Sequence, residues 1–189
     1  MGLGLDWHTA PVQGGPGTVV ATGIFDLLHV GHLRFLRAAR AAGSRLVIGV
    51  ENDERAHARK GPGRPIVPAA ERCEMVAALV PVDGVFLISG PPSLPPVPAY
   101  RELLRAAWPA TLALTGGDPA EAGKRAVAAH LGANVLVVPH VQDHSTTWLM
   151  RRLTESGALP VYAAPITATH DATPGPPSVC AAPRRAPAT

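Results

Sequence analysis

Apolar and polar positions are arranged along the central part of the chain in two kinds of block. Short, almost continuous apolar runs predict buried strands at residues 18–24, 45–50, 85–88, 111–115 and 135–138. Longer stretches with apolar residues three or four positions apart predict helices at residues 32–42, 69–79, 100–107, 120–131 and 146–154. Strands that alternate with helices are typical of α/β proteins. We therefore expect three α/β/α layers around a parallel sheet of about five strands.

The two ends of the chain lack this pattern. Residues 1–16 are rich in glycine and proline without periodicity, so we expect a flexible lead-in. Residues 159–189 are rich in alanine, proline and threonine and have little to bury, so we expect a disordered tail. The predicted folded domain is then 17–158.

The composition narrows the class of protein. The chain has 189 residues, 47% of them hydrophobic, which is enough for one domain with its own core. A net charge of +3 with 4% aromatic residues argues against a nucleic-acid partner and suits a small anionic ligand. Cys73 and Cys180 show no disulfide or zinc spacing. No signal peptide or spanning segment of about 20 apolar residues is evident, so we expect a cytoplasmic protein without a membrane partner.

Candidate chemistry gathers between the first strand and the first helix. The strand is followed by a turn with the sequence Gly23-Ile24-Phe25-Asp26. Two histidines, His29 and His32, come next and flank Gly31. In parallel α/β sheets, ligands bind at the carboxyl ends of the strands, and this segment lies at such an end.

Both glycines and both histidines suit a phosphate ligand. Gly23 allows a tight turn, and Gly31 lets a ligand approach the helix start, where free N–H groups favour an anion. His29 and His32 are three positions apart, so both imidazoles face one space and can donate to phosphoryl oxygens during transfer. Two competing interpretations are histidines that only cap and pack the helix, and a zinc site, for which no third ligand is evident.

The stretch Thr-Gly-Ile-Phe-Asp-Leu-Leu-His-Val-Gly-His at residues 22–32 resembles the signature of the cytidylyltransferase-like nucleotidylyltransferases, the His-x-Gly-His superfamily. It is nearest in pattern to the group of heptose-phosphate adenylyltransferases and glycerol-3-phosphate cytidylyltransferases, and the resemblance covers residues 19–153. It implies a Rossmann-like fold and Mg²⁺ as cofactor. The implied reaction transfers a nucleoside monophosphate from CTP or ATP to a phosphorylated small molecule, such as a sugar or polyol phosphate, and releases pyrophosphate.

The resemblance also implies roles for residues later in the chain. Lys60 opens a basic loop that closes over the triphosphate, Asp118 holds the nucleoside, and the hydroxyl groups before the last helix bind the phosphate tail. In all, His29, His32 and Lys60 are implied to be catalytic. The implied nucleotide-binding residues are Gly23, Ile24, Phe25, Asp26, Gly31, Arg72, Asp118, Ser145, Thr146 and Thr147.

Simpler structural roles compete with these. The loop after Lys60 suits a solvated connection, and Arg72 suits a surface position beside Glu71. Asp118, followed by Pro119, suits the N-cap of a helix, and Ser145 suits another.

The sequence departs from the family pattern at two places. Thr115 stands where many sugar-phosphate members have lysine, and residues 140–143 lack the arginine that glycerol-phosphate members carry. The open alternatives are an FAD synthetase resembling FMN adenylyltransferases, and a nucleotide-binding regulator with weak catalysis. A homodimer is also left open.

Overall fold

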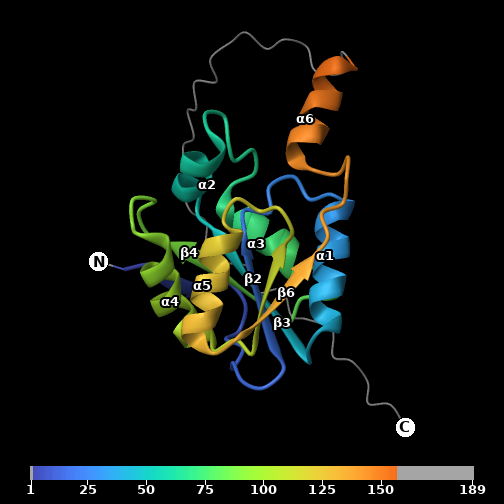
Figure 1. Cartoon of the computed structure of the whole chain (residues 1–189). Helices are drawn as coiled ribbons and strands as arrows, with labels where there is room; N and C mark the ends of the chain where they lie inside the picture. Colours follow the sequence, from blue (N-terminus) through green and yellow to red (C-terminus); the bar gives the residue numbers. More distant parts are fainter. Residues whose placement is uncertain (1, 157–189) are drawn as a thin grey trace, which may run out of the picture.

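Five parallel strands form most of one sheet in the computed structural model, which describes residues 2–156 (Figure 1). The strands are β2 (Thr18–Gly23), β3 (Arg45–Glu51), β4 (Gly84–Ser89), β5 (Thr111–Thr115) and β6 (Asn134–Val138). Their order across the sheet is β4-β3-β2-β5-β6, so β2 is the central strand. The predicted tail at 159–189 lies outside the described residues.

Helices cover both faces of this sheet, as the alternation of elements predicts. The helices are α1 (Val30–Ala41), α2 (Asp53–Lys60), α3 (Ala69–Ala77), α4 (Pro96–Ala107), α5 (Glu121–Leu131) and α6 (Thr146–Glu155). Side chains of α1 and α3 pack in one core cluster, and side chains of α4 and α5 pack in the other. The Rossmann-like α/β fold is thereby confirmed.

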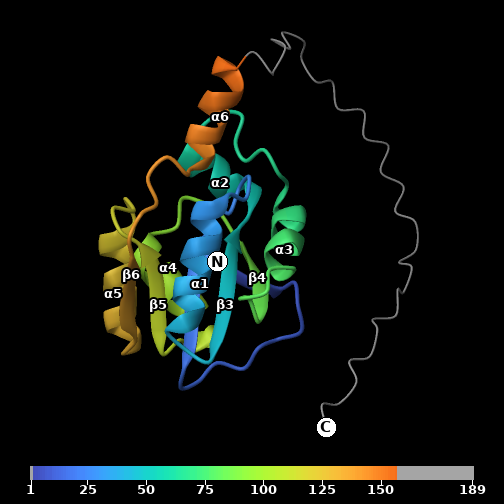
Figure 2. The same cartoon turned by 90° about the vertical axis from the view of Figure 1, so that its right-hand side faces the viewer.

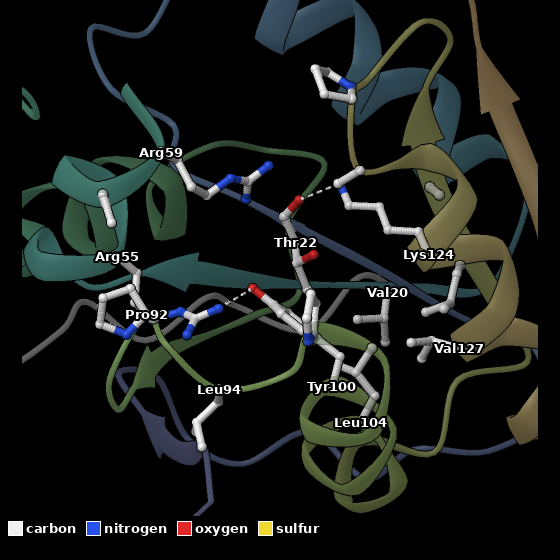
Figure 3. Close-up of a pocket in the computed structure, with 17 residues that line it drawn as sticks. Val20, Thr22, Arg55, Arg59, Pro92, Leu94, Tyr100, Leu104, Lys124 and Val127 are labelled. Atoms are coloured by element: carbon white, nitrogen blue, oxygen red, sulfur yellow. Dashed lines mark hydrogen bonds between the residues drawn. The ribbon is translucent and has the colours of Figure 1, made fainter. Parts of the chain in front are cut away.

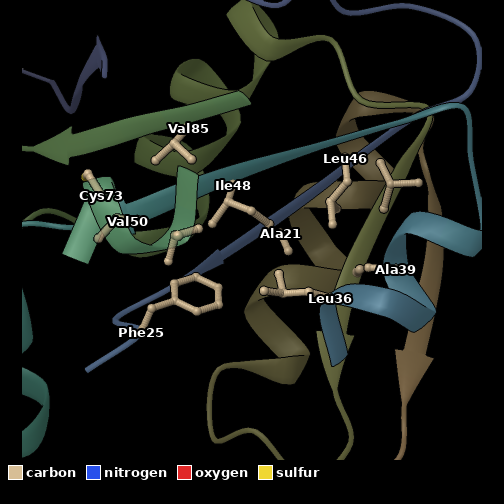
Figure 4. Close-up of a cluster of buried hydrophobic side chains, with 12 residues drawn as sticks. Ala21, Phe25, Leu36, Ala39, Leu46, Ile48, Val50, Cys73 and Val85 are labelled. Carbon is tan, nitrogen blue, oxygen red and sulfur yellow. The ribbon is translucent and has the colours of Figure 1, made fainter. Parts of the chain in front are cut away.

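The strands supply both cores because their side chains alternate between the two faces. Val19 and Ala21 of β2 lie in the cluster under α1 and α3, which Figure 4 shows, whereas Val20 lies in the cluster under α4 and α5. All three side chains are buried, with at most 1% exposed. Burial on both faces explains why these strands are apolar throughout.

The N-terminal segment differs from the prediction of a flexible lead-in. Residues Gly4–Trp7 form β1, which pairs with β4 in the antiparallel direction and makes the sheet six-stranded. Trp7 contacts Phe86 with ring centroids 5.6 Å apart. Four residues are too few to show a strand period, so this pairing depends on the partner strand rather than on local pattern.

Helix α2 is a second element that the apolar pattern misses. Its eight residues are mostly charged, and only Arg55 and Ala56 are buried. The side chain of Asn52 caps it by accepting from the N–H of Arg55 at 3.0 Å. Helix α6, by contrast, is predicted, but it has no buried residues and lies beyond the carboxyl ends of the strands in both views (Figures 1 and 2).

Within residues 2–156, none of the helices combines the length and the apolar character that spanning a bilayer requires.

Candidate active site

The chain turns sharply between β2 and α1. The sequence predicts that Gly23 allows this turn, but the residues with positive φ angles are Phe25 (55°) and Leu27 (46°). Gly23 has a different role, since a Cβ there would lie 3.0 Å from the Phe25 ring. That ring is buried in the core under α1, so the turn is held by tertiary packing. Non-glycine residues in this conformation are uncommon and gather at functional sites.

The two histidines lie together at the start of α1. His29 is the N-cap residue, and His32 is in the first turn. Their rings stack with centroids 3.8 Å apart. The backbone N–H of His29 donates to Nδ1 of His32 over 3.4 Å. Because that Nδ1 accepts, neutral His32 carries its proton on Nε2, which is the donor available to a ligand.

Both imidazoles are neutral near pH 7. Burial lowers the pKa of His32 to about 3, and the neighbouring His29 adds to the shift. Burial also lowers the pKa of His29, with contributions from His144 and His140. Nδ1 of His29 is buried and has no hydrogen-bond partner among residues 2–156. This atom faces the first turn of α1, because a Cβ at Gly31 would lie only 2.9 Å from it.

The start of α6 faces the same space. Ser145 is its N-cap and accepts from the N–H of Trp148 at 3.1 Å. The hydroxyl of Thr146 donates to the carbonyl oxygen of Asp26 at 2.6 Å, which ties α6 to the turn after β2. A Cβ at Gly31 would lie 2.8 Å from the carbonyl oxygen of His144. Gly31 therefore lets the segment before α6 pack closely on the start of α1.

Asp118 lies at the carboxyl end of β5, and it does not have the competing structural role of N-cap of α5. That helix begins at Glu121 with Ala120 as its cap residue, and Asp118 accepts from the N–H of Ala120 at 2.9 Å. Its other oxygen accepts from Nζ of Lys124 at 2.7 Å. Burial by itself raises the pKa of Asp118, but the bonds from Lys124 and Ala120 outweigh it and hold the pKa below its usual value.

The loop between α2 and α3 is anchored by Asp26. This buried carboxylate accepts from Nε of Arg64 at 2.7 Å and from the N–H groups of Ile66 and Val67 at 3.0 Å. These bonds outweigh the effect of burial, which raises the pKa of Asp26, and the pKa lies below its usual value. Lys60 is the last residue of α2 rather than a loop residue, and its side chain is exposed.

Arg72 is a correction to the predicted site. Its side chain is fully buried, with 0% exposed. It donates to the carbonyl oxygens of Ile24, Val67 (2.8 Å) and Glu51 (2.8 Å), and it forms an ion pair with Asp53 at 2.7 Å. The guanidinium has no exposed donor, so it holds the ends of β2 and β3 in place and is not available to a phosphate.

A single cavity of about 370 Å³, the histidine cavity, joins these parts. Every predicted site residue except Arg72 lines it, so the structure brings together His29, His32, Lys60, Gly23, Ile24, Phe25, Asp26, Gly31, Asp118, Ser145, Thr146 and Thr147. The starts of two helices open into this cavity, and helix N-termini favour anions.

A family model described as cytidylyltransferase-like matches residues 20–147 of this chain. The chain belongs to the cytidylyltransferase-like family. The match runs from β2 to the start of α6, so it includes all the residues of the histidine cavity, and it confirms the resemblance seen in the sequence.

Relatives of this cytidylyltransferase-like chain include two curated proteins, each called bifunctional protein HldE. The one from Koribacter versatilis is 39% identical over 138 residues, which cover 71% of this chain and 26% of the relative. The one from Methylococcus capsulatus is 36% identical over 146 residues, which cover 75% of this chain and 29% of the relative. The chain thus spans between a quarter and a third of these relatives.

One solved structure is also similar. It is the lipopolysaccharide core biosynthesis protein from Thermoplasma volcanium, which is 26% identical, with a TM-score of 0.51. The match covers 67% of this chain and 98% of that chain. This agreement supports the same arrangement of strands and helices.

Arg64 belongs to the basic loop that the sequence predicts after Lys60. Two other cationic side chains that line the histidine cavity, Arg59 and Lys124, were not predicted, and neither were His140 and His144. In the sequence, residues 140–143 are distinguished only by the lack of the arginine that glycerol-phosphate members carry. Lys124 lies nine positions after Thr115 along the chain. The sequence pattern did not indicate that α5 places Lys124 at the carboxyl end of β5.

Proposed function

We propose that this chain transfers a nucleoside monophosphate from ATP or CTP to a phosphorylated small molecule in the cytoplasm. One observation carries the proposal: a pair of neutral, stacked histidines and the hydroxyl-rich start of α6 open into one cavity. An oxygen of the acceptor phosphate attacks the α-phosphorus of the nucleotide. The bond from that phosphorus to the bridging oxygen breaks, and pyrophosphate leaves with the electron pair.

The side chains divide the work by position. Nε2–H of His32 donates to the oxygens of the transferred phosphoryl group, where negative charge builds up. Lys60 approaches from α2 and places a positive charge beside the triphosphate. Ser145, Thr146 and Thr147 bind the pyrophosphate end at the start of α6. Asp118 positions Lys124 through their ion pair, and its predicted contact with the nucleoside remains part of this proposal.

Mg²⁺ belongs to the proposal as the companion of the triphosphate. Within residues 2–156, no group of three or more histidine, cysteine, aspartate or glutamate side chains could hold a metal ion. Mg²⁺ is commonly held by substrate phosphates together with few protein ligands. When bound, it supplies neutralisation of charge on the phosphate oxygens.

The family resemblance places sugar and polyol phosphates among the acceptors to test. The HldE relatives do not favour the alternative of an FAD synthetase. No observation favours the alternative of a weak regulator, since both histidines are in place and line the cavity.

A pyrophosphate-release screen tests the proposal. CTP, ATP, GTP and UTP are each offered with Mg²⁺ and a panel of phosphorylated acceptors, and the variant His32→Ala serves as background. We expect release that needs both a nucleotide and an acceptor. If no combination exceeds the His32→Ala background, the proposed reaction is wrong.

A further inference from the structure

A second cavity, of about 420 Å³, lies beside the histidine cavity (Figure 3). Thr22, Arg59, Pro119 and Lys124 line both cavities and form the rim that they share. One molecule can therefore occupy the second cavity and reach over this rim into the first. Cavities of this size commonly enclose the body of a small ligand.

The interior of the second cavity is apolar. Side chains from β2, β5, α4 and α5, and from the segment before α4, form most of its wall, among them Val20, Leu94, Leu104, Leu112 and Val127. Such a wall stabilises a ligand by removing apolar surface from water. It offers no partners to hydroxyl groups, and burying an unpaired hydroxyl is unfavourable.

The polar side chains inside this cavity are already paired with protein groups. The Tyr100 hydroxyl donates to Oε1 of Glu51, and Nε of Arg55 donates to Oε2 of the same carboxylate at 2.6 Å. Arg55 also donates to the Tyr100 hydroxyl at 3.0 Å and to the carbonyl oxygen of Pro91 at 3.0 Å. Burial raises the pKa of Tyr100 to beyond its ordinary range, so this hydroxyl stays protonated. A sugar would thus find few free partners here.

The shared rim is cationic. Figure 3 shows Thr22 between Arg59 and Lys124, and Nζ of Lys124 donates to the carbonyl oxygen of Thr22 at 3.3 Å. Arg59 contacts Glu51 at 3.3 Å and Asp118 at 3.9 Å. Together with the adjacent pair of Arg55 and Glu51, the ion-pair network at the rim has three cations and two carboxylates, which leaves a net charge of +1. The Arg59 side chain is 37% exposed and Lys124 is 21% exposed, so both retain donors for an anion.

We infer that the second cavity binds the acceptor, and that the acceptor is a phosphomonoester with an aliphatic or aromatic body. The body lies against the apolar wall, and the phosphate lies at the rim beside Arg59 and Lys124. This rests on the proposed function, because the rim is the place from which the acceptor phosphate reaches a nucleotide in the histidine cavity. Many sugar-phosphate members of the family have a lysine where this chain has Thr115. Lys124 lines the same cavity as Thr115 and supplies a cation there.

Direct binding tests the inference without turnover. Hexyl phosphate and glucose 1-phosphate carry the same phosphate on an apolar and a polyhydroxylated body, and calorimetry compares their affinities for the full chain. We expect hexyl phosphate to bind at least about tenfold more tightly. Equal or tighter binding of glucose 1-phosphate overturns the inference.

A variant that fills the second cavity locates the binding. Gly123 lines this cavity and not the other, and a Cβ there meets only Cγ2 of Val97, at 3.9 Å. Gly123→Leu should therefore fold, and it should lower the affinity for hexyl phosphate about tenfold. Ala129→Leu places the same side chain on an exposed position of α5 and should change nothing. Unchanged affinity in a folded Gly123→Leu protein overturns the site.

The charge at the rim is tested with Lys124→Met. This variant should lower the affinity for hexyl phosphate about tenfold and leave the affinity for hexanol unchanged, since only the phosphate group needs the cation. Equal loss for both ligands contradicts a phosphate site at the rim.

The two proposals fail differently. Pyrophosphate release with sugar phosphates, but neither binding nor turnover of hexyl phosphate, overturns the apolar acceptor and keeps the nucleotidyl transfer. Hexyl phosphate binding that Gly123→Leu weakens, without pyrophosphate release from any nucleotide and acceptor, overturns the transfer and supports the binding site.

Discussion

At the scale of single residues, the environment of His32 decides its chemistry. Burial keeps the imidazole neutral, and the N–H of His29 fixes its proton on Nε2. A neutral donor held in place needs no reorganisation when charge develops on a phosphoryl oxygen. Its protonation state is also constant across the physiological range, because its pKa is about 3.

Replacement of His32 by alanine should lower kcat by about 10²–10³-fold, the typical loss when one preorganised donor is removed. The KM for nucleotide should change little. Steady-state pyrophosphate release measures both, and the exposed His57, replaced by alanine, is the matched control. Near-normal turnover of a folded His32→Ala protein contradicts the assignment.

The same residue makes stability depend on pH. The pKa of His32 is about 3 in the folded protein and 6.5 for the free side chain, so the unfolded chain takes up the proton first as the pH falls. Its contribution is present above pH 6.5 and is lost progressively down to pH 3. Between pH 6.5 and pH 5 the free energy of unfolding should fall by roughly 2 kcal/mol, since one pH unit corresponds to about 1.4 kcal/mol.

Urea unfolding of His32→Gln and His57→Gln over this pH range checks that expectation. His32→Gln should lose the part of the pH dependence that His32 causes, whereas His57→Gln should retain the full dependence. A wild-type pH profile in folded His32→Gln would show that His32 is not buried in its neutral form.

At the scale of elements, one carboxylate holds the loop between α2 and α3. Asp26 is 1% exposed and binds Arg64 and two backbone N–H groups. Asp26→Ala leaves these donors unpaired and should lower the free energy of unfolding by about 3 kcal/mol. Limited proteolysis should also cut residues 61–68 faster.

Controls separate this anchor from ordinary surface pairs. Asp26→Asn keeps an acceptor and should cost less than alanine. Glu155→Ala breaks a pair with Arg151 in which both side chains are 64% exposed, and it should leave stability unchanged. Equal stability of Asp26→Ala and wild type would contradict the anchor.

Lys60 tests whether α2 and the following loop serve the nucleotide. Lys60→Ala should raise the KM for nucleotide, because Lys60 lines the histidine cavity and carries a positive charge. Lys60→Arg should recover part of the loss, since the guanidinium keeps the charge but differs in shape. Arg37→Ala removes an exposed cation elsewhere on the surface and should be silent. Wild-type kinetics of Lys60→Ala would exclude the lysine from nucleotide binding.

At the scale of the whole molecule, one edge of the sheet lies away from the site. β1 extends the sheet at the edge beside β4, whereas the histidine cavity lies over β2 and β5. Trp7→Ala removes a half-buried ring that contacts Phe86 and should lower the free energy of unfolding by about 2 kcal/mol.

The kinetics of Trp7→Ala at low temperature should match the wild type, because the site does not contact β1. His8→Ala, an exposed neighbour, should alter neither quantity. A folded Trp7→Ala protein with reduced kcat would show that the edge of the sheet is coupled to the site.

Local signals predicted most of the framework. The apolar runs of β2, β3, β4, β5 and β6 are long enough to identify without a partner, and the histidine segment lies at the carboxyl end of β2 as expected. The sequence pattern did not predict β1, which has only four residues, or α2, which is mostly polar. Both elements are stabilised by contacts with neighbouring elements, and the spacing of apolar residues along the chain does not reveal such contacts.

By itself, the sequence determined the alternation of strands and helices and the family signature, because both depend on residues close together in the chain. Only the tertiary structure decided which charged side chains remain available. Arg72 and Ile24 are 48 positions apart, and their contact buries the arginine in the protein. Lys124 and Thr22 are 102 positions apart, and their contact brings an unpredicted cation to the site. Contacts between such distant residues follow from how the elements pack, and no local pattern encodes them.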